Sequence, residues 1–236
     1  MFPGFSALGA LALAGCQAAP ATVEARGFGY LCSGAPSDAA CNESPGVAAT
    51  PLDVGLPERI AVGSSVRFTF WPPGHASGSA PVPVADESAG VLQRAADAAH
   101  GFRVDRPGSI ALAAFAPSGE VIGRARLEAF AVDHVGFDRF ASDEAQPASQ
   151  QSIPRARLER LGDRTILRAV PMNAEGDVLA GALACKWTSS NPGVVDVQGP
   201  TNGNFVTVLA TGAGQTTLHV DLGGASADLP IDVSVR

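Results

Sequence analysis

Hydrophobic and polar residues alternate through much of the C-terminal third of the chain. The alternation leads into Trp187, stops in the turn-forming run Ser189–Gly193, and resumes with Val195 and Val197. Further alternating runs follow, separated by turns rich in Gly and Asn: "FVTVLAT", "QTTLHVDL" and "LPIDVSV". A period of two predicts strands with one buried face. Short strands at frequent turns, without a long helical pattern, are typical of an all-β sandwich.

A fainter copy of this order of segments precedes the first. "VADESAGVLQR" stands where "WTSSNPGVVDV" stands in the second copy, without the Trp, and "ARLEAFAV" parallels "LPIDVSV". The sequence therefore predicts two tandem Ig-like sandwiches, over residues 50–132 and 133–236. In the second, "VDHVGFD" is expected to be the first strand, and the polar run "SDEAQPASQQS" a loop.

Two side chains are predicted to lie in the second core. Trp187 ends a strand directly before the turn, so its ring is expected to fill the space between two sheets. Cys185 shares a strand face with Leu183 and Trp187 because these residues are two apart. We therefore interpret Cys185 as a buried free thiol.

The motif around Trp187 resembles the bacterial Ig-like group 2 (BIG2) family. The resemblance covers roughly residues 155–236 and is carried by W-T-S-S-N-P, by Gly214, Thr216 and Leu218 after it, and by the closing D-V-S-V. It implies a β-sandwich domain, and group 2 relatives often occur in surface and adhesive proteins. Upstream, "NAEGD" is expected to be a hairpin turn.

The N-terminus carries a pattern of export. Residues 1–15 hold no charged side chain, and their apolar run is shorter than the roughly 20 residues that span a bilayer, so they are typical of a secretory signal peptide. Leu13-Ala14-Gly15-Cys16 resembles the lipobox of bacterial lipoproteins, which implies removal of residues 1–15 and lipidation of Cys16. The alternative is an ordinary cleaved signal peptide. Gln17 favours the outer membrane, and residues 16–49 are expected to form a tether.

Export makes disulfides chemically permissible. Cys32 and Cys41 lie in a Gly-, Pro- and Ser-rich stretch, and a bridge between them would close a short loop worth about 2.7 kcal/mol. We predict this disulfide. Metal binding is the alternative, disfavoured because no His or second Cys pair lies close by.

Charge and motifs narrow the function classes. The net charge of −7 and the absence of a basic stripe disfavour nucleic-acid binding. His75, in "GHASG", lacks the G-x-S-x-G pattern of a hydrolase, and His219 is expected to face outward from a strand. We interpret the acids at the junction as solvated linker acids, with a calcium site as the disfavoured alternative: Asp133, Asp138, Asp143 and Glu144. We predict no catalytic residue, no metal and no cofactor.

The leading hypothesis is a lipid-anchored protein of the bacterial cell envelope whose Ig-like domains act as a non-catalytic spacer, adhesion or interaction module. Its partners would be the membrane, through the lipid, and an unknown protein or surface polysaccharide. An accessory subunit of a larger envelope assembly, such as a secretion or motility complex, is the alternative. An enzyme ranks third, because a fold alone does not settle function.

Overall fold

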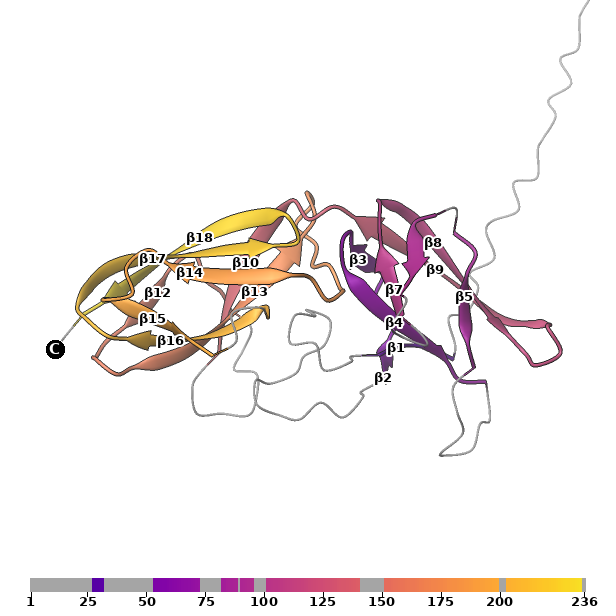
Figure 1. The fold of residues 1–236 in the computed structure, drawn as a ribbon, viewed down its shortest axis with the longest axis horizontal. Coiled ribbons are helices and arrows are strands. Elements are labelled where there is room, and N and C mark those ends of the chain that lie inside the picture. The colour runs from indigo at the N-terminus through magenta and orange to yellow at the C-terminus, as the bar shows by residue number, and fades with distance from the viewer. Residues whose placement is uncertain are drawn as a thin grey trace, which may run out of the picture.

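Every regular element of the described chain is a β-strand, which confirms the all-β prediction. The structure is a computed structural model that describes residues 27–31, 53–72, 82–88, 90–95, 101–140, 151–199 and 203–234. Two sandwiches lie end to end (Figure 1). The predicted lipidation site Cys16 and the predicted Cys32–Cys41 bridge lie outside the described residues.

The first sandwich consists of a five-stranded sheet, ordered β2-β1-β4-β7-β6, and a four-stranded sheet, ordered β3-β9-β8-β5. Its strands are β1 (Phe28–Leu31), β2 (Asp53–Gly55), β3 (Arg59–Ala61), β4 (Ser65–Phe70), β5 (Val84–Asp86), β6 (Leu92–Arg94), β7 (Gly101–Val104), β8 (Gly108–Phe115) and β9 (Val121–Phe130). All pairs are antiparallel except β3 with β9, which run parallel.

The second sandwich repeats this plan, with sheets ordered β11-β10-β13-β16-β15 and β12-β18-β17-β14. Its strands are β10 (His134–Phe140), β11 (Gln151–Ser152), β12 (Ala156–Leu158), β13 (Arg164–Met172), β14 (Cys185–Ser189), β15 (Val195–Gln198), β16 (Phe205–Ala210), β17 (Gly214–Leu222) and β18 (Ala225–Val233). Here β12 runs parallel to β18, as β3 does to β9. Each strand of one sandwich has a counterpart in the other, and the division into two sheets is that of an Ig-like fold.

One strand of the first sandwich comes from the segment expected to be a tether. β1 pairs with β2 on one side and with β4 on the other, and its Tyr30 side chain is fully buried. The prediction that residues 16–49 form a tether is therefore wrong at Phe28–Leu31. The run joins the sheet with two aromatic rings, Phe28 and Tyr30, which are buried in the core of the first sandwich.

The registers show which residues of the two sandwiches are equivalent. β8 and β17 both begin at a glycine with positive φ, Gly108 (139°) and Gly214 (134°). At the same distance along each strand, β8 pairs with Val84 and β17 pairs with Trp187. Val84 therefore occupies the place of Trp187, in agreement with the alignment of "VADESAGVLQR" with "WTSSNPGVVDV".

The two cores carry a large aromatic ring on different strands, β14 in the second sandwich and β4 in the first. In the second, Trp187 on β14 packs with Phe137, and the β13 residue paired with Phe137 is the small Ala169. In the first, Phe28 is the counterpart of Phe137, and it pairs with Phe70 on β4, whose ring centroid lies 4.8 Å away. The second sandwich thus has its large ring on β14 and the small Ala169 on β13, whereas the first has its large ring on β4 and the smaller Val84 on β5.

Gly123 in β9 makes room for the ring of Phe70. A Cβ at Gly123 would lie 2.5 Å from Phe70 Cε2 and 3.1 Å from Phe28 Cε2. The counterpart in β18 is Ala227, since Gly123 pairs with Ala114 and Ala227 with Val220. We expect Gly123→Ala to lower the free energy of unfolding of the first sandwich by about 1–3 kcal/mol through overpacking.

The matched control is Ala227→Gly, which removes a methyl where none is in conflict and should cost no more than about 1 kcal/mol. Urea denaturation of the full chain followed by circular dichroism measures both changes. A Gly123→Ala variant as stable as the wild type would mean that the Phe70 ring does not lie against β9.

Candidate functional site

Trp187 lies inside the second sandwich, with 2% of its surface exposed. Its Nε1–H donates a hydrogen bond to the carbonyl oxygen of Gly203, 3.0 Å away, and its ring lies 6.0 Å from that of Phe137. The turn after it is held by side chains: Asn191 Oδ1 accepts from the amide of Gly193, and Thr216 Oγ1 accepts from the amide of Asn191. The stretch around Trp187 is therefore core and turn, and it presents no aromatic binding surface.

Cys185 is a free thiol with 7% of its surface exposed. Burial raises the pKa of this thiol to about 12, since the charged form would lose its hydration. A thiol in that state is protonated at neutral pH and unsuited to nucleophilic or redox chemistry.

A hairpin turn projects from the second sandwich toward the first. As expected, "NAEGD" forms this turn: Asn173 N–H donates to Asp177 O, and Asp177 N–H donates to Asn173 Oδ1 at 2.8 Å. The chain then runs back as the segment Val178–Leu183, which we call the joint loop. Its Leu179 N–H donates to Pro171 O, so the joint loop stays attached to β13.

The joint loop is hydrogen-bonded to the first sandwich through backbone groups. Ala180 N–H donates to Arg59 O and Ala180 O accepts from Ala61 N–H, at 3.0 and 2.8 Å. Ser65 and Ala182 exchange two further bonds, at 2.9 and 3.0 Å. The joint loop thus adds to the edge of the first sandwich beside β3, and four backbone hydrogen bonds cross between the domains.

Side chains interlock at the same place. Ala61 of the first sandwich belongs to the core cluster of the second, and Ala180 of the second belongs to that of the first. Gly181, with φ of +112°, passes directly over the buried Ser64. Arg59 Nε also reaches Asp177 Oδ2 at 3.1 Å, an ion pair exposed enough to add little stability. The two cores meet with no flexible linker between them.

Asp138 departs from its predicted state. It was expected to be a solvated linker acid, but it lies in β10 with 8% exposure and accepts from Arg168 Nη2 at 2.6 Å. The Arg168 guanidinium also lies over the rings of Phe140 and Phe205, at 5.5 and 5.9 Å. Burial of both partners makes this pair a structural element of the second sandwich. Of the other junction acids, Asp133 is exposed beside His134, while Asp143 and Glu144 lie outside the described residues.

His219 faces outward from β17, as expected, within an exposed polar cluster. Its Nδ1 lies 2.8 Å from Asp228 Oδ1 and its Nε2 lies 3.2 Å from Asp221 Oδ1, while Ser226 Oγ donates to that same Asp221 oxygen. The Ser226 hydroxyl therefore bonds a carboxylate and not the imidazole, so the geometry is not that of a nucleophile activated by a base. The hydrogen bond to Asp228 raises the pKa of His219 above its ordinary value. The hydrogen bond that Asp221 accepts from Ser226 holds the pKa of Asp221 below its ordinary value.

We expect the His219 titration to depend on Asp228. The pKa of His219 is raised in the folded state, so protonated His219 stabilises the β17–β18 hairpin. This stabilisation is complete at pH values below the pKa of the unfolded state, and it is lost as the pH rises through the pKa of the folded state. Asp228→Asn should therefore lower the titration midpoint of His219, measured by NMR of the imidazole protons. Asp232→Asn, on the same strand but bonded to Arg155, is the control. An unchanged midpoint in Asp228→Asn would contradict the contact.

The described ranges contain neither a candidate metal site nor a candidate membrane-spanning helix. No group of three or more His, Cys, Asp or Glu side chains there is placed to hold a metal ion. The same residues contain no helix long and apolar enough to cross a membrane. His75 lies outside these residues.

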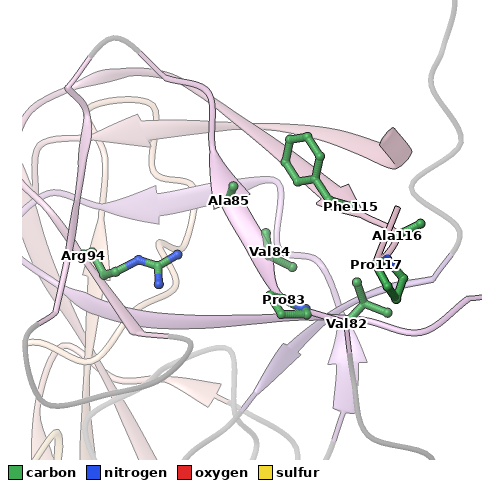
Figure 2. Close-up of a pocket in the computed structure, with 8 residues that line it drawn as sticks. All are labelled: Val82, Pro83, Val84, Ala85, Arg94, Phe115, Ala116 and Pro117. Atoms are coloured by element: carbon green, nitrogen blue, oxygen red, sulfur yellow. The ribbon is translucent and has the colours of Figure 1, made fainter. Parts of the chain in front are cut away.

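A pocket of about 470 Å³ opens on the first sandwich (Figure 2). It lies beside β5, which is on the side of this sandwich away from the second one (Figure 1). It lies between the edge strands β5 and β6 and the turn that follows β8. Its lining is apolar apart from one arginine: Val82, Pro83, Val84, Ala85, Arg94, Phe115, Ala116 and Pro117. The guanidinium of Arg94 points toward β5 from the opposite wall (Figure 2).

Sequence reasoning missed both the joint loop and this pocket. The joint loop has no chemical motif, and its role appears only when two domains are placed together. The pocket had a detectable signal, since the alignment that puts Val84 in the place of Trp187 also exposes the loss of a large ring there.

Known proteins share only the general architecture of the chain. No family model matches it, and no curated protein matches it in sequence. Among solved structures, domains 4 and 5 of the S-layer protein SbsC are 14% identical, with a TM-score of 0.31 over 64% of this chain and 75% of that one. The Yersinia pseudotuberculosis adhesin InvE is 19% identical, with a TM-score of 0.32 over 76% of this chain and 57% of that one.

A C-terminal intimin fragment, solved in complex with the intimin-binding domain of its translocated receptor, is 14% identical, with a TM-score of 0.32. The match covers 72% of this chain and 58% of that one, so the chain spans little more than half of the InvE and intimin chains. Likeness at this level does not extend to function.

Proposed function

We propose that this chain is a lipid-anchored protein of the bacterial cell envelope, whose two Ig-like sandwiches act as a stiff, non-catalytic spacer that holds an interaction surface away from the membrane. Cys16 carries the lipid, and the partner is a protein or a surface polysaccharide. The lipobox-like Leu13–Cys16 supports the anchor, and the motif around Trp187 supports a module of the BIG2 type. The outer membrane is the expected location.

The observation that carries the spacer is the joint between the domains. Ig-like modules on a free linker would sample many angles and hold a distant surface poorly. Here only Ala131, Val132 and Asp133 separate β9 from β10, and four backbone hydrogen bonds from the joint loop span the boundary. Each such bond contributes about 0.5–1.5 kcal/mol, so their sum opposes bending strongly.

The anchor is tested by Cys16→Ser. We expect the wild-type chain to sediment with membranes and the variant to appear in the soluble fraction, because one or more acyl chains at about 0.8 kcal/mol per buried CH₂ supply the membrane affinity. Mass spectrometry of the mature N-terminus provides the direct measurement. An unmodified N-terminal residue other than Cys16, or a variant still bound to membranes, would contradict the proposed anchor.

A further inference from the structure

We propose that the pocket on the first sandwich binds a small amphipathic monocarboxylate, an acyl or aryl group with a single carboxylate. The carboxylate bonds Arg94, and the apolar part lies against Val84 and Phe115. This site is additional to the proposed spacer role, since the joint loop takes no part in it.

The two sandwiches serve as an internal comparison, and they differ most where the pocket lies. The counterpart of Val84 is Trp187, whose ring is buried in the second sandwich. The counterpart of Arg94 is Val197, the third residue of β15, which packs against the second core. The first sandwich thus has the smaller Val84 where the second has Trp187, and the charged Arg94 where the second has Val197.

The third difference is in the hairpin that closes the pocket. β17 and β18 pair in continuous register up to the tight turn at Gly223 and Gly224. In the first sandwich the register shifts between Ala114 and Phe115, and the longer turn after β8 adds Ala116 and Pro117 to the pocket wall. Such bulges re-aim side chains and are frequent beside binding sites. Three separate departures from the shared plan therefore border one pocket.

The charge of the pocket selects the ligand class. Among the described lining residues Arg94 is the one that carries a charge, and no described carboxylate lies within ion-pair distance of it. Its guanidinium lies over the ring of Phe102, 5.9 Å from the ring centroid. A planar guanidinium binds a carboxylate through two parallel hydrogen bonds, and Arg94 is exposed, so its guanidinium is accessible to a ligand from solvent.

The size of the pocket is compatible with a small molecule. A volume of about 470 Å³ falls within the roughly 300–1,000 Å³ of ordinary ligand pockets, which are mostly apolar with a few polar groups that fix orientation. The described residues of the pocket offer one cation and no paired acid, which matches one anionic group on an apolar body.

The test compares decanoate with its neutral analogue 1-decanol, with binding to the purified chain followed by NMR of backbone amides. We expect decanoate to shift the amide signals of the pocket residues Val82, Val84, Ala85, Arg94, Phe115 and Ala116, and to bind about two- to fivefold more tightly than decanol. Arg94→Val, which installs the residue of the second sandwich, should reduce decanoate affinity to that of decanol. Arg94→Lys should retain part of the preference, and Ala116→Trp should block both ligands.

Arg157→Val is the matched control, because it removes an exposed arginine from the second sandwich and changes the net charge equally. Circular dichroism establishes that each variant is folded. Equal affinity for decanoate and decanol, shifts spread over both sandwiches, or unchanged binding in a folded Arg94→Val variant would each overturn the proposal. Such a failure leaves the spacer role intact, because the joint between the domains is tested separately.

Discussion

Replacing Trp187 with alanine is expected to lower the free energy of unfolding of the second sandwich by about 3–5 kcal/mol. The ring is 2% exposed, contacts Phe137, and satisfies the carbonyl of Gly203 through its Nε1–H. Alanine would leave a cavity between the sheets and remove that hydrogen bond. A domain of this kind has only about 5–15 kcal/mol of stability in total, so a large part of it would be lost.

The matched control is Val84→Ala at the equivalent position of the first sandwich. Val84 is also buried, but only two methyl groups are removed, so the expected loss is about 2 kcal/mol. Calorimetry of the full chain resolves the two effects as shifts of different unfolding transitions. A transition of the second sandwich within about 1 °C of the wild type in Trp187→Ala would mean that the ring contributes no packing.

Alternation and turn chemistry were sufficient to predict much of the second sandwich. The period-two runs on either side of Ser189–Gly193 mark β14, β15 and the strands after them. The expected turn at Asn173–Asp177 is also present, held by the Asn173 side chain. These signals are local, since each depends on neighbouring residues only. The same logic applies to His219, which faces solvent as its place between Leu218 and Val220 implies.

Features that depend on distant partners were missed or misjudged. β1 is a run of only four residues, and it becomes a strand because β2 and β4 lie on both sides. Asp138 was expected to be solvated, but Arg168 on the neighbouring strand pairs with it and both are buried. A single sequence shows which residues are polar, but it does not show which element will cover them.

The candidate binding pocket could be predicted from the sequence only in part. An internal repeat gives a sequence its own reference, because each departure of one copy from the other needs a physical reason. The move of the large ring from β14 to β4 accounts for Gly123, whose missing side chain accommodates Phe70. It does not account for Arg94, an exposed arginine that stands where the second sandwich has an apolar residue. The position of the site could therefore have been predicted from the repeat. Its shape could not, because it depends on the register shift between Ala114 and Phe115, which only the structure shows.

Gly181→Ala is expected to open the joint between the two sandwiches. A residue with a side chain at φ of +112° costs about 1–2 kcal/mol by itself, and the added Cβ would overlap the Oγ and Cβ of the buried Ser64. The joint loop would have to move away from β3, and the hydrogen bonds of Ala180 and Ala182 would break with it. The sandwiches would remain folded but would change their relative orientation freely.

Gly176→Ala separates the two causes. Gly176 lies in the same hairpin with φ of +85°, but a Cβ there meets nothing within 4 Å, so this variant has the conformational cost without the clash. Amide hydrogen exchange at Ala61 and Ser65, whose N–H groups bond the joint loop, should accelerate at least about tenfold in Gly181→Ala relative to Gly176→Ala. Small-angle scattering should show a single extended shape for Gly176→Ala and a broad distribution of dimensions for Gly181→Ala. Equal exchange rates and equal scattering profiles in the two variants would mean that the joint loop does not hold the sandwiches together, and the stiff spacer would have to be abandoned.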